Sequence, residues 1–203
     1  ILPDRDFFPR LKAIADRYCI AIVVDEVQSG AGRTGKMWAI ENFGIEPDIV
    51  AAAKGLGSGM PIGAVIAKEH WMRWKPGSHG STFGGNPVAA AAAIATLEVI
   101  RDEHLMQNAV DRGAQALTGL RAGLAGNKHV TDIRGIGLMI GVDFTDGDIA
   151  GEVEVEAFER GLLVLTCGDR GVRMSPPLVV NETEMATAIR IFCEAAAAVA
   201  ARH

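Results

Sequence analysis

Two short apolar runs, each ending in a charged residue, constrain the fold more than any other feature of this sequence. The first run is residues 20–24 (IAIVV), followed by Asp25, and the second is residues 49–53 (IVAAA), followed by Lys54. Apolar runs of this length are typical of strands that are covered on both faces, as in parallel sheets flanked by helices. The sequence therefore predicts an α/β fold with these two strands buried in a mostly parallel sheet.

The charged residues at the ends of these runs predict a ligand site. In open α/β sheets the carboxyl ends of the strands form the ligand crevice, so we expect Asp25 and Lys54 to point into one site. That pair suits an enzyme whose lysine forms a Schiff base while the aspartate adjusts the bound cofactor. The alternative interpretation is a buried ion pair with a purely structural role.

Composition narrows the class of partner. The chain has 203 residues, 49% of them hydrophobic and 22% charged, with a net charge of -5 and no basic block. Nothing in this balance indicates nucleic acid or an anionic membrane surface, so we expect a small-molecule partner. No apolar stretch approaches the roughly 18 residues that cross a bilayer, and the first residues do not form a signal peptide. These features predict a soluble, cytoplasmic protein.

The three cysteines predict neither a disulfide nor a metal site. Cys19, Cys167 and Cys193 are widely spaced, with no C-x-x-C pair and no matching histidines. We expect all three to be small apolar residues of the core.

Periodicity and turn residues divide the chain into two parts near residue 100. Residues 1–100 read as an α/β part and residues 101–203 as a smaller α+β part. Asn86 before Pro87 predicts a helix start, and Asn181 with Glu184 resembles a capping box. The predicted helices are residues 7–18, 37–43, 88–100, 103–124, 152–160 and 182–200, and β structure is predicted at residues 20–24, 49–53, 64–67, 133–144, 161–166 and 171–174.

The glycine loop at residues 30–36 (GAGRTGK) admits three interpretations. A dinucleotide-binding turn requires the glycines to follow the strand at once, but residues 25–29 intervene. A phosphate-cradling P-loop requires a Ser or Thr after Lys36, where this chain has Met37. We therefore favour a turn in which glycine permits positive φ. A nucleotide-binding module that uses this loop stays as an alternative function.

Several motifs in a fixed order carry a resemblance to one enzyme family. They are residues 25–30 (DEVQSG), 32–35 (GRTG), 47–48 (PD), 54–55 (KG), 61–64 (PIGA), 81–87 (STFGGNP), 134–138 (RGIGL) and 173–178 (RMSPPL). With these motifs the chain resembles the class III pyridoxal-phosphate-dependent aminotransferases, and within them the 4-aminobutyrate and related ω-aminotransferases. The resemblance implies part of the fold type I large domain, followed by the small C-terminal domain. It also implies transfer of an amino group to a 2-oxo acid, with racemisation or an aminomutase reaction on the same cofactor as the alternative.

The resemblance also implies a role for each matching residue. Pyridoxal 5'-phosphate is expected as the cofactor and a homodimer as the assembly. The matching residues are Lys54, which forms the Schiff base; Asp25, which pairs with the pyridine nitrogen; Val27, which packs on the ring; Gln28, which bonds the ring's 3-oxygen; Thr82, which reaches the cofactor phosphate of the partner subunit; and Arg173, which holds a substrate carboxylate.

The resemblance further implies that the chain is a C-terminal fragment, because members of the family are about twice as long. The missing half supplies the phosphate-binding turn, the aromatic residue on the other ring face and a substrate-gating glutamate. We therefore expect apolar surface left exposed. A third alternative function is a folded chain that does not bind the cofactor.

Overall fold

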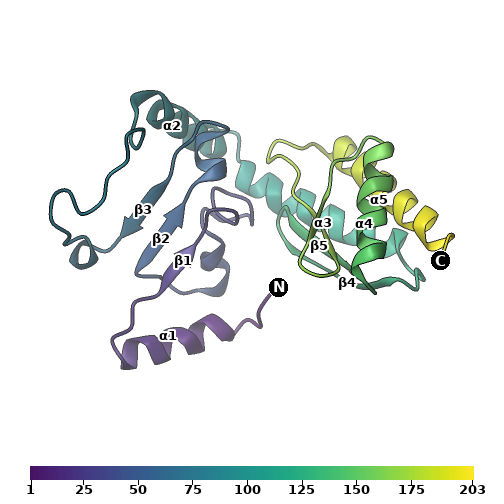
Figure 1. The fold of residues 1–203 in the computed structure, drawn as a ribbon, viewed down its shortest axis with the longest axis horizontal. Helices are drawn as coiled ribbons and strands as arrows, with labels where there is room; N and C mark the ends of the chain where they lie inside the picture. Colours follow the sequence, from purple (N-terminus) through teal and green to yellow (C-terminus); the bar gives the residue numbers. More distant parts are fainter. The chain divides into compact units, whose positions relative to one another are not determined.

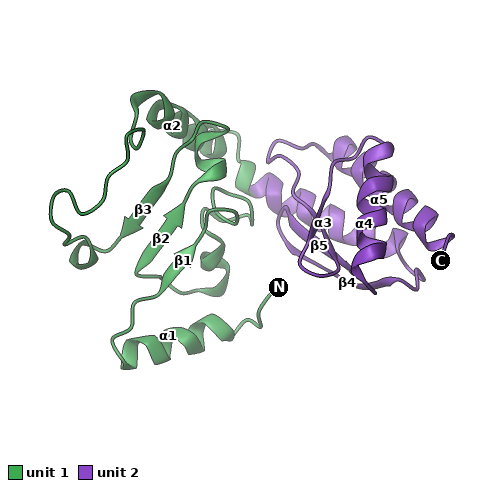
Figure 2. Ribbon diagram, viewed as in Figure 1, with its two compact units in different colours: residues 1–106 green, residues 107–203 purple.

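The computed structural model describes residues 1–203, which form two compact units, residues 1–106 and residues 107–203 (Figure 2). The helices and strands, in chain order (Figure 1), are α1 (Phe7–Arg17), β1 (Val23–Asp25), η1 (Ala39–Phe43), β2 (Ile49–Ala52), η2 (Lys54–Gly57), β3 (Ala64–Ala67), η3 (Glu69–Trp71), α2 (Pro87–Asp102), α3 (Leu105–Gly123), β4 (Val130–Ile136), β5 (Met139–Phe144), α4 (Gly147–Glu159), β6 (Leu165–Cys167), β7 (Gly171–Met174) and α5 (Glu182–Ala200). The elements η1, η2 and η3 are short 3-10 helices. We call the first compact unit unit 1 and the second unit 2.

Unit 1 is built on a three-stranded sheet in the order β1-β2-β3. β1 and β2 are parallel, with Asp25 opposite Ala51, and β3 is antiparallel to β2. Both apolar runs form strands, which confirms the α/β class, but β1 is shorter than predicted and starts at Val23. The first sheet is thus mixed, with one parallel and one antiparallel pair.

The two faces of this sheet are covered unequally. Residues directly opposite each other point to the same side, so Val50 and Ala52 share one face, and Val23, Asp25 and Val65 share the other. Val50 and Ala52 are buried, and Ala52 packs with Leu56 of η2 and Ala93 of α2.

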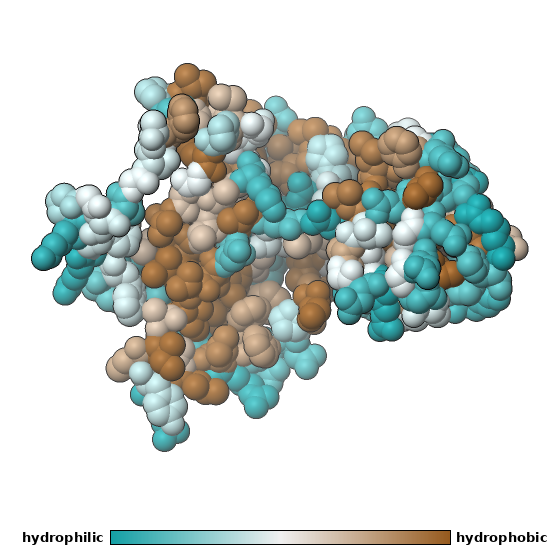
Figure 3. All heavy atoms as spheres, viewed as in Figure 1, coloured by the Kyte–Doolittle hydropathy of each residue, from teal (hydrophilic) through white to brown (hydrophobic).

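The face that carries Asp25 is uncovered. Val23 is 60% exposed and Val65 is 55% exposed. The prediction that these strands are buried on both faces is therefore wrong, because only one face has a packing layer in this chain. Figure 3 shows apolar residues gathered at the surface over the strands of unit 1, as expected for a chain that resembles half of a larger protein.

Unit 2 is a four-stranded antiparallel sheet in the order β4-β5-β7-β6 with helices packed on it. Its core brings Val142 and Phe144 of β5 together with Val172 of β7, Val153 of α4 and Phe192 of α5, all at most 1% exposed. The predicted β segment over residues 133–144 is a hairpin of two strands, since Ile136 pairs with Met139. The two-residue turn between the strands was not predicted, because the apolar alternation continues across it.

Helix caps explain where several helices begin. Asn86 accepts a hydrogen bond from the Ala89 N–H, and Asn181 forms the predicted capping box with Glu184. Helix α4 begins at Gly147, five residues before the predicted start, because Asp146 accepts from the Ile149 N–H. That cap lies in a polar segment where apolar periodicity gives no signal.

The cysteines depart from the expectation of burial. Cys19 is exposed in the turn after α1, and Cys167 and Cys193 are only partly buried. Cys19 adopts a positive φ of 55° at the point where the chain leaves the helix.

No helix in the structure is long and apolar enough to span a bilayer.

Candidate active site

The parallel pairing of β1 and β2 brings the two predicted site residues to one edge of the sheet. Asp25 is the last residue of β1 and lies opposite Ala51, while Lys54 follows the end of β2. Because parallel strands end at the same edge, the carboxylate and the amine both lie at the carboxyl end of the sheet. This is the position at which open α/β sheets bind their ligands.

Asp25 and Lys54 do not form an ion pair. Both residues are exposed, and the hydrogen bond that Asp25 makes is to its own loop, where Oδ1 accepts from the Val27 N–H at 3.0 Å. The interpretation of these residues as a buried structural ion pair is therefore wrong. Oδ2 of Asp25 and Nζ of Lys54 are both left available to a ligand.

The opposite end of the same sheet shows what a structural charge pair looks like in this protein. Asp48 precedes β2, accepts a hydrogen bond from the Ile22 N–H at 2.9 Å and lies 3.5 Å from Nζ of Lys68. The hydrogen bond from Ile22 is the main cause that holds the pKa of Asp48 below its ordinary value, and Lys68 adds to it. Charges at the amino end of the sheet are thus mutually satisfied, whereas those at the carboxyl end are not.

Lys54 has an unusual backbone conformation. Its φ is 44°, in the left-handed region that residues other than glycine rarely adopt. Such a conformation costs on the order of 1–3 kcal/mol and persists only where the surrounding structure imposes it. Here Ala52 and Leu56, both buried, anchor the chain on either side of Lys54. Strain of this kind is concentrated at functional sites.

Glu26 is a site-supporting residue to which sequence reasoning assigned no role. It is only 4% exposed, its Oε1 accepts from the Ile40 N–H at 2.8 Å, and its Oε2 accepts from the Ser29 hydroxyl at 2.5 Å. A buried carboxylate needs such donors. Glu26 thereby ties the start of the loop after β1 to η1 and fixes the segment that carries Val27 and Gln28. The signal in the sequence was an acidic residue directly after Asp25. Neighbouring residues of an extended segment point to opposite sides, so Glu26 is directed away from the site.

The glycine loop at residues 30–36 is a turn, as the sequence indicates. Gly32 and Gly35 have φ values of 88° and 84°, and no α-helix begins there, because the next element is the short η1 at Ala39. Gly30 is needed for another reason, since a Cβ there would lie 2.8 Å from the Trp38 ring. A phosphate-binding loop requires a following α-helix, which this loop lacks.

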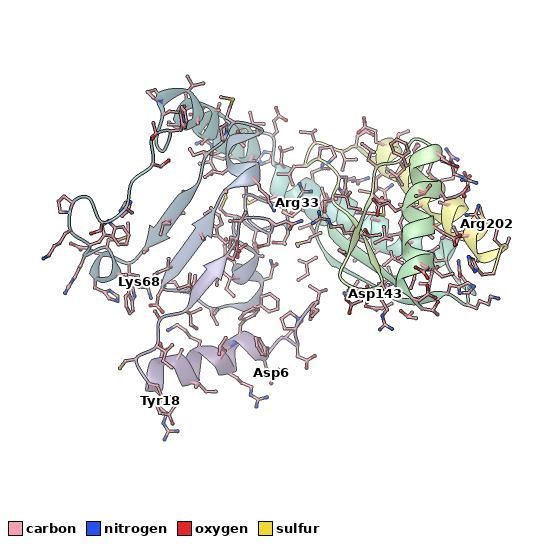
Figure 4. The ribbon with its side chains drawn as sticks, viewed as in Figure 1. Asp6, Tyr18, Arg33, Lys68, Asp143 and Arg202 are labelled. Atoms are coloured by element: carbon pink, nitrogen blue, oxygen red, sulfur yellow. The ribbon has the colours of Figure 1, made fainter.

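In the same loop, burial lowers the pKa of Arg33, labelled in Figure 4, although arginine stays charged.

The other predicted cofactor residues lie in loops of unit 1. Val27 is partly buried and Gln28 is exposed, both directly after β1. Thr82 lies in the exposed segment between η3 and α2. Their positions near strand ends or in an exposed loop leave them accessible to a ligand or to a second subunit.

Arg173 lies in unit 2, on the face of the β4-β5-β7-β6 sheet that is turned away from the core. It is half-buried, while its neighbours Val172 and Met174 point to the core and are at most 3% exposed. No carboxylate of the chain pairs with Arg173. A half-buried guanidinium without a partner is suited to binding a carboxylate in a bidentate manner.

Comparisons with known proteins agree along the whole chain. The family model described as aminotransferase class-III matches residues 1–196. An acetylornithine aminotransferase of Nostoc sp. is 44% identical over 202 residues, which cover 98% of this chain and 47% of that protein. A second acetylornithine aminotransferase, from Methanothermobacter thermautotrophicus, is 45% identical over 192 residues, or 94% of this chain and 49% of that protein.

Solved structures show the same relationship. The structure of Plasmodium falciparum ornithine delta-aminotransferase superposes with a TM-score of 0.94 at 34% identity and covers 100% of this chain and 54% of that one. A transaminase from the marine bacterium Virgibacillus gives a TM-score of 0.94 at 29% identity, over 100% of this chain and 50% of that one. The chain spans about half the length of the relatives that it matches.

Proposed function

Because this chain belongs to the aminotransferase class-III family, whose members depend on pyridoxal 5'-phosphate, we propose that its protein transfers an amino group from an amino donor to a 2-oxo acid. The observation that carries the proposal is the pairing of β1 with β2, which brings Asp25 and Lys54 to one sheet edge, where neither is paired with an opposite charge of the chain. The aminotransferase names of the relatives favour transfer over racemisation.

The residues at this edge fit the cofactor. A pyridine N–H needs an acceptor, and Oδ2 of Asp25 is without a hydrogen bond while Oδ1 is held by the Val27 N–H. An aldehyde needs a primary amine, which Lys54 supplies from a backbone held in place by buried neighbours. When bound, the cofactor supplies a ring that withdraws electrons from the substrate carbon next to the amino group.

Each residue of the site then has a defined task. The amine of Lys54 would hold the cofactor, and its Nζ when free would move the proton at the carbon that bears the amino group. Asp25 keeps the pyridine nitrogen protonated. Val27 would pack on the ring and Gln28 would donate to the ring's 3-oxygen. In a homodimer, Thr82 would reach the phosphate bound to the partner subunit.

Arg173 and the names of the relatives both support a substrate class. Acetylornithine, ornithine and 4-aminobutyrate all carry an amine at one end of a short carbon chain and a carboxylate at the other. Arg173 would bind that carboxylate, and the terminal amine is the group that is transferred. The relatives' names favour N-acetylornithine or ornithine as the donor, with 4-aminobutyrate as the second candidate.

The test uses the full-length protein that contains this chain, loaded with pyridoxal phosphate. N-acetylornithine, ornithine and 4-aminobutyrate are each supplied with 2-oxoglutarate, and glutamate formation is measured. We expect turnover with at least one donor and a loss of at least about a thousandfold in Lys54→Ala, the usual scale for removal of a covalent catalyst.

Lys36→Ala is the matched control, because Lys36 is an exposed lysine of the neighbouring glycine loop. It should retain turnover. Racemised donor without a 2-oxo acid product would favour the isomerase alternative. Nucleotide binding that disappears in Lys36→Ala would favour a nucleotide-binding module.

A further inference from the structure

We propose that Arg134 is a positioning residue that sequesters Asp143 and so leaves Arg173 free to bind the substrate carboxylate. The inference rests on the proposed function, because it takes Arg173 as the carboxylate-binding group. It adds a residue on a different strand that acts on the substrate only through Asp143.

Strand register places Arg134, Asp143 and Arg173 on one face of the unit 2 sheet. Arg134 of β4 lies opposite Gly141 of β5, which in turn lies opposite Arg173 of β7. Asp143 lies two residues along β5 from Gly141, opposite Gly171, and so points to the same side. Asp143 is therefore diagonal to both arginines, within reach of long side chains in an antiparallel sheet.

Asp143 pairs with Arg134 and not with Arg173. Arg134 donates from Nη2 to Oδ1 of Asp143 at 2.9 Å, and its Nη1 lies 2.9 Å from Oδ2, a bidentate arrangement. Asp132 also accepts from Nη1 at 2.7 Å. The hydrogen bond to Asp143 is the main cause that raises the pKa of Arg134 above its ordinary value. Both oxygens of Asp143, labelled in Figure 4, are thus engaged by Arg134, and neither forms a contact with Arg173.

The asymmetry between the two arginines lies in their own strands. Two residues before Arg134 stands Asp132, which supplies a second carboxylate, whereas two residues before Arg173 stands Gly171, which supplies none. With Asp143 bound by Arg134, Arg173 is left as the unpaired cation of this face. Arg173 therefore stays free, while the charge of Arg134 is neutralised by Asp132 and Asp143.

Gly141 supports an approach to Arg173 between the two side chains. A Cβ at Gly141 would meet Nη2 of Arg134 at 3.9 Å, an ordinary contact, and its φ does not require glycine. By contrast, a Cβ at Gly171 would lie 2.9 Å from Oδ1 of Asp143. Glycine inside a strand weakens it and often marks a site where a ligand approaches. The missing side chain keeps open the space between Arg134 and Arg173.

The consequence is a specific effect of removing Arg134. Without its partner, Asp143 turns to Arg173 and competes with the substrate carboxylate as an internal anion. A purely structural ion pair would instead weaken the fold, with no recovery when Asp143 is also neutralised. The two roles therefore differ in the behaviour of the double variant.

The test measures KM and kcat for N-acetylornithine and 2-oxoglutarate in the full-length holoenzyme and in Arg134→Met, Asp143→Asn and the double variant. We expect Arg134→Met to raise KM about fivefold, the size of a partly exposed ion pair, with little change in kcat. Asp143→Asn should leave KM unchanged or lower it, and the double variant should return KM to within about twofold of the wild type. Arg134→Gln replaces Arg134→Met if the latter does not fold.

Two further variants separate the outcomes. Arg190→Met removes an exposed arginine that pairs only with Glu194 on α5, and it should leave KM unchanged. Arg173→Met should raise KM far more than Arg134→Met; if it does not, the role of Arg173 in the proposed function fails. If Arg173→Met has its effect but Arg134→Met does not, or if the double variant shows no recovery, the inference on Arg134 alone is overturned.

Discussion

The two units of this chain both contain a sheet, but they differ in what covers its second face. In unit 2 all of the largest fully buried side chains of the protein are found, among them Phe144, Phe192 and Leu120. In unit 1 the sheet face that carries Asp25 has exposed Val23 and Val65. The residues proposed for chemistry thus lie mostly in the unit that is less complete by itself.

The composition of the second face explains the difference. In unit 2 the face turned away from the core carries Arg134, Asp132 and Asp143, which form ion pairs, and Arg173, and these polar groups tolerate water. In unit 1 the corresponding face is apolar apart from Asp25, and apolar surface of that extent requires a covering layer. A polar second face allows a unit to stand by itself, whereas an apolar one marks a surface made to be covered.

Separation of the units should break this comparison most strongly. Residues 105–203, which keep α3 whole, should fold alone and unfold cooperatively in urea, because their core is internal. Residues 1–104 should aggregate or show no cooperative transition. Circular dichroism and size-exclusion chromatography measure both outcomes. A cooperative, monomeric fold of residues 1–104 would contradict the account of the uncovered face.

Matched core truncations should give the next largest effect. Phe192→Ala removes a side chain that is 0% exposed and should lower the free energy of unfolding by about 3–5 kcal/mol. Val23→Ala removes one that is 60% exposed and should change it by less than about 0.5 kcal/mol in this chain. Urea denaturation of the two variants compares them directly. Equal losses would show that the face of Val23 is packed.

Helix caps sharpen the comparison at a smaller scale. Asn181→Ala removes the cap of α5, whose residues Phe192 and Val199 belong to the unit 2 core, and should cost about 1 kcal/mol of unfolding free energy. Asn86→Ala removes the equivalent cap of α2 in unit 1. We expect only the first change to shift the unfolding transition of unit 2. A shift of the same size in both would mean that the units unfold together.

The smallest predicted effect is a pH dependence of α4. The hydrogen bond from the Ile149 N–H is the main cause that lowers the pKa of Asp146 below its ordinary value. A lowered pKa in the folded state means that the stabilisation is present above the unfolded pKa of about 3.9 and is lost as the pH falls through the folded value.

Asp146→Asn keeps a capping acceptor but removes this titration. Unfolding free energies of the wild type and the variant, measured in urea between about pH 2 and pH 6, should therefore converge at the acidic end. A difference that does not change with pH would rule out Asp146 as the titrating cap.

Local signals in the sequence predicted most of the elements. Asn86 before Pro87 and the Asn181–Glu184 pair predicted the starts of α2 and α5, because caps act over a few residues. The comparisons confirm the predicted class III family and its α/β fold, but not the predicted 4-aminobutyrate or ω-aminotransferase subtype. Exposed apolar surface was expected, but its location at Val23 could not be predicted, since burial depends on which layers lie over a strand and not on the strand's own residues. The turn between β4 and β5 was missed because apolar alternation continues across it.

The candidate site was predictable only where it coincides with the ends of apolar runs. Asp25 and Lys54 follow such runs, and β1-β2 pairing brings them to one edge. Glu26 and Asp143 gave no such signal, because their partners Ile40 and Arg134 are set by loop path and strand register. The roles of Val27, Gln28, Thr82 and Arg173 stay predictions.

The central claim is that Lys54 carries the cofactor, and chemical labelling tests it most directly. The full-length protein is loaded with pyridoxal phosphate, reduced with borohydride, digested with trypsin and mapped by mass spectrometry. The account predicts one labelled peptide, residues 37–68, left uncleaved at Lys54 because the reduced lysine resists trypsin. A label at Lys36 or Lys68 instead, or no label on the protein at all, would contradict it.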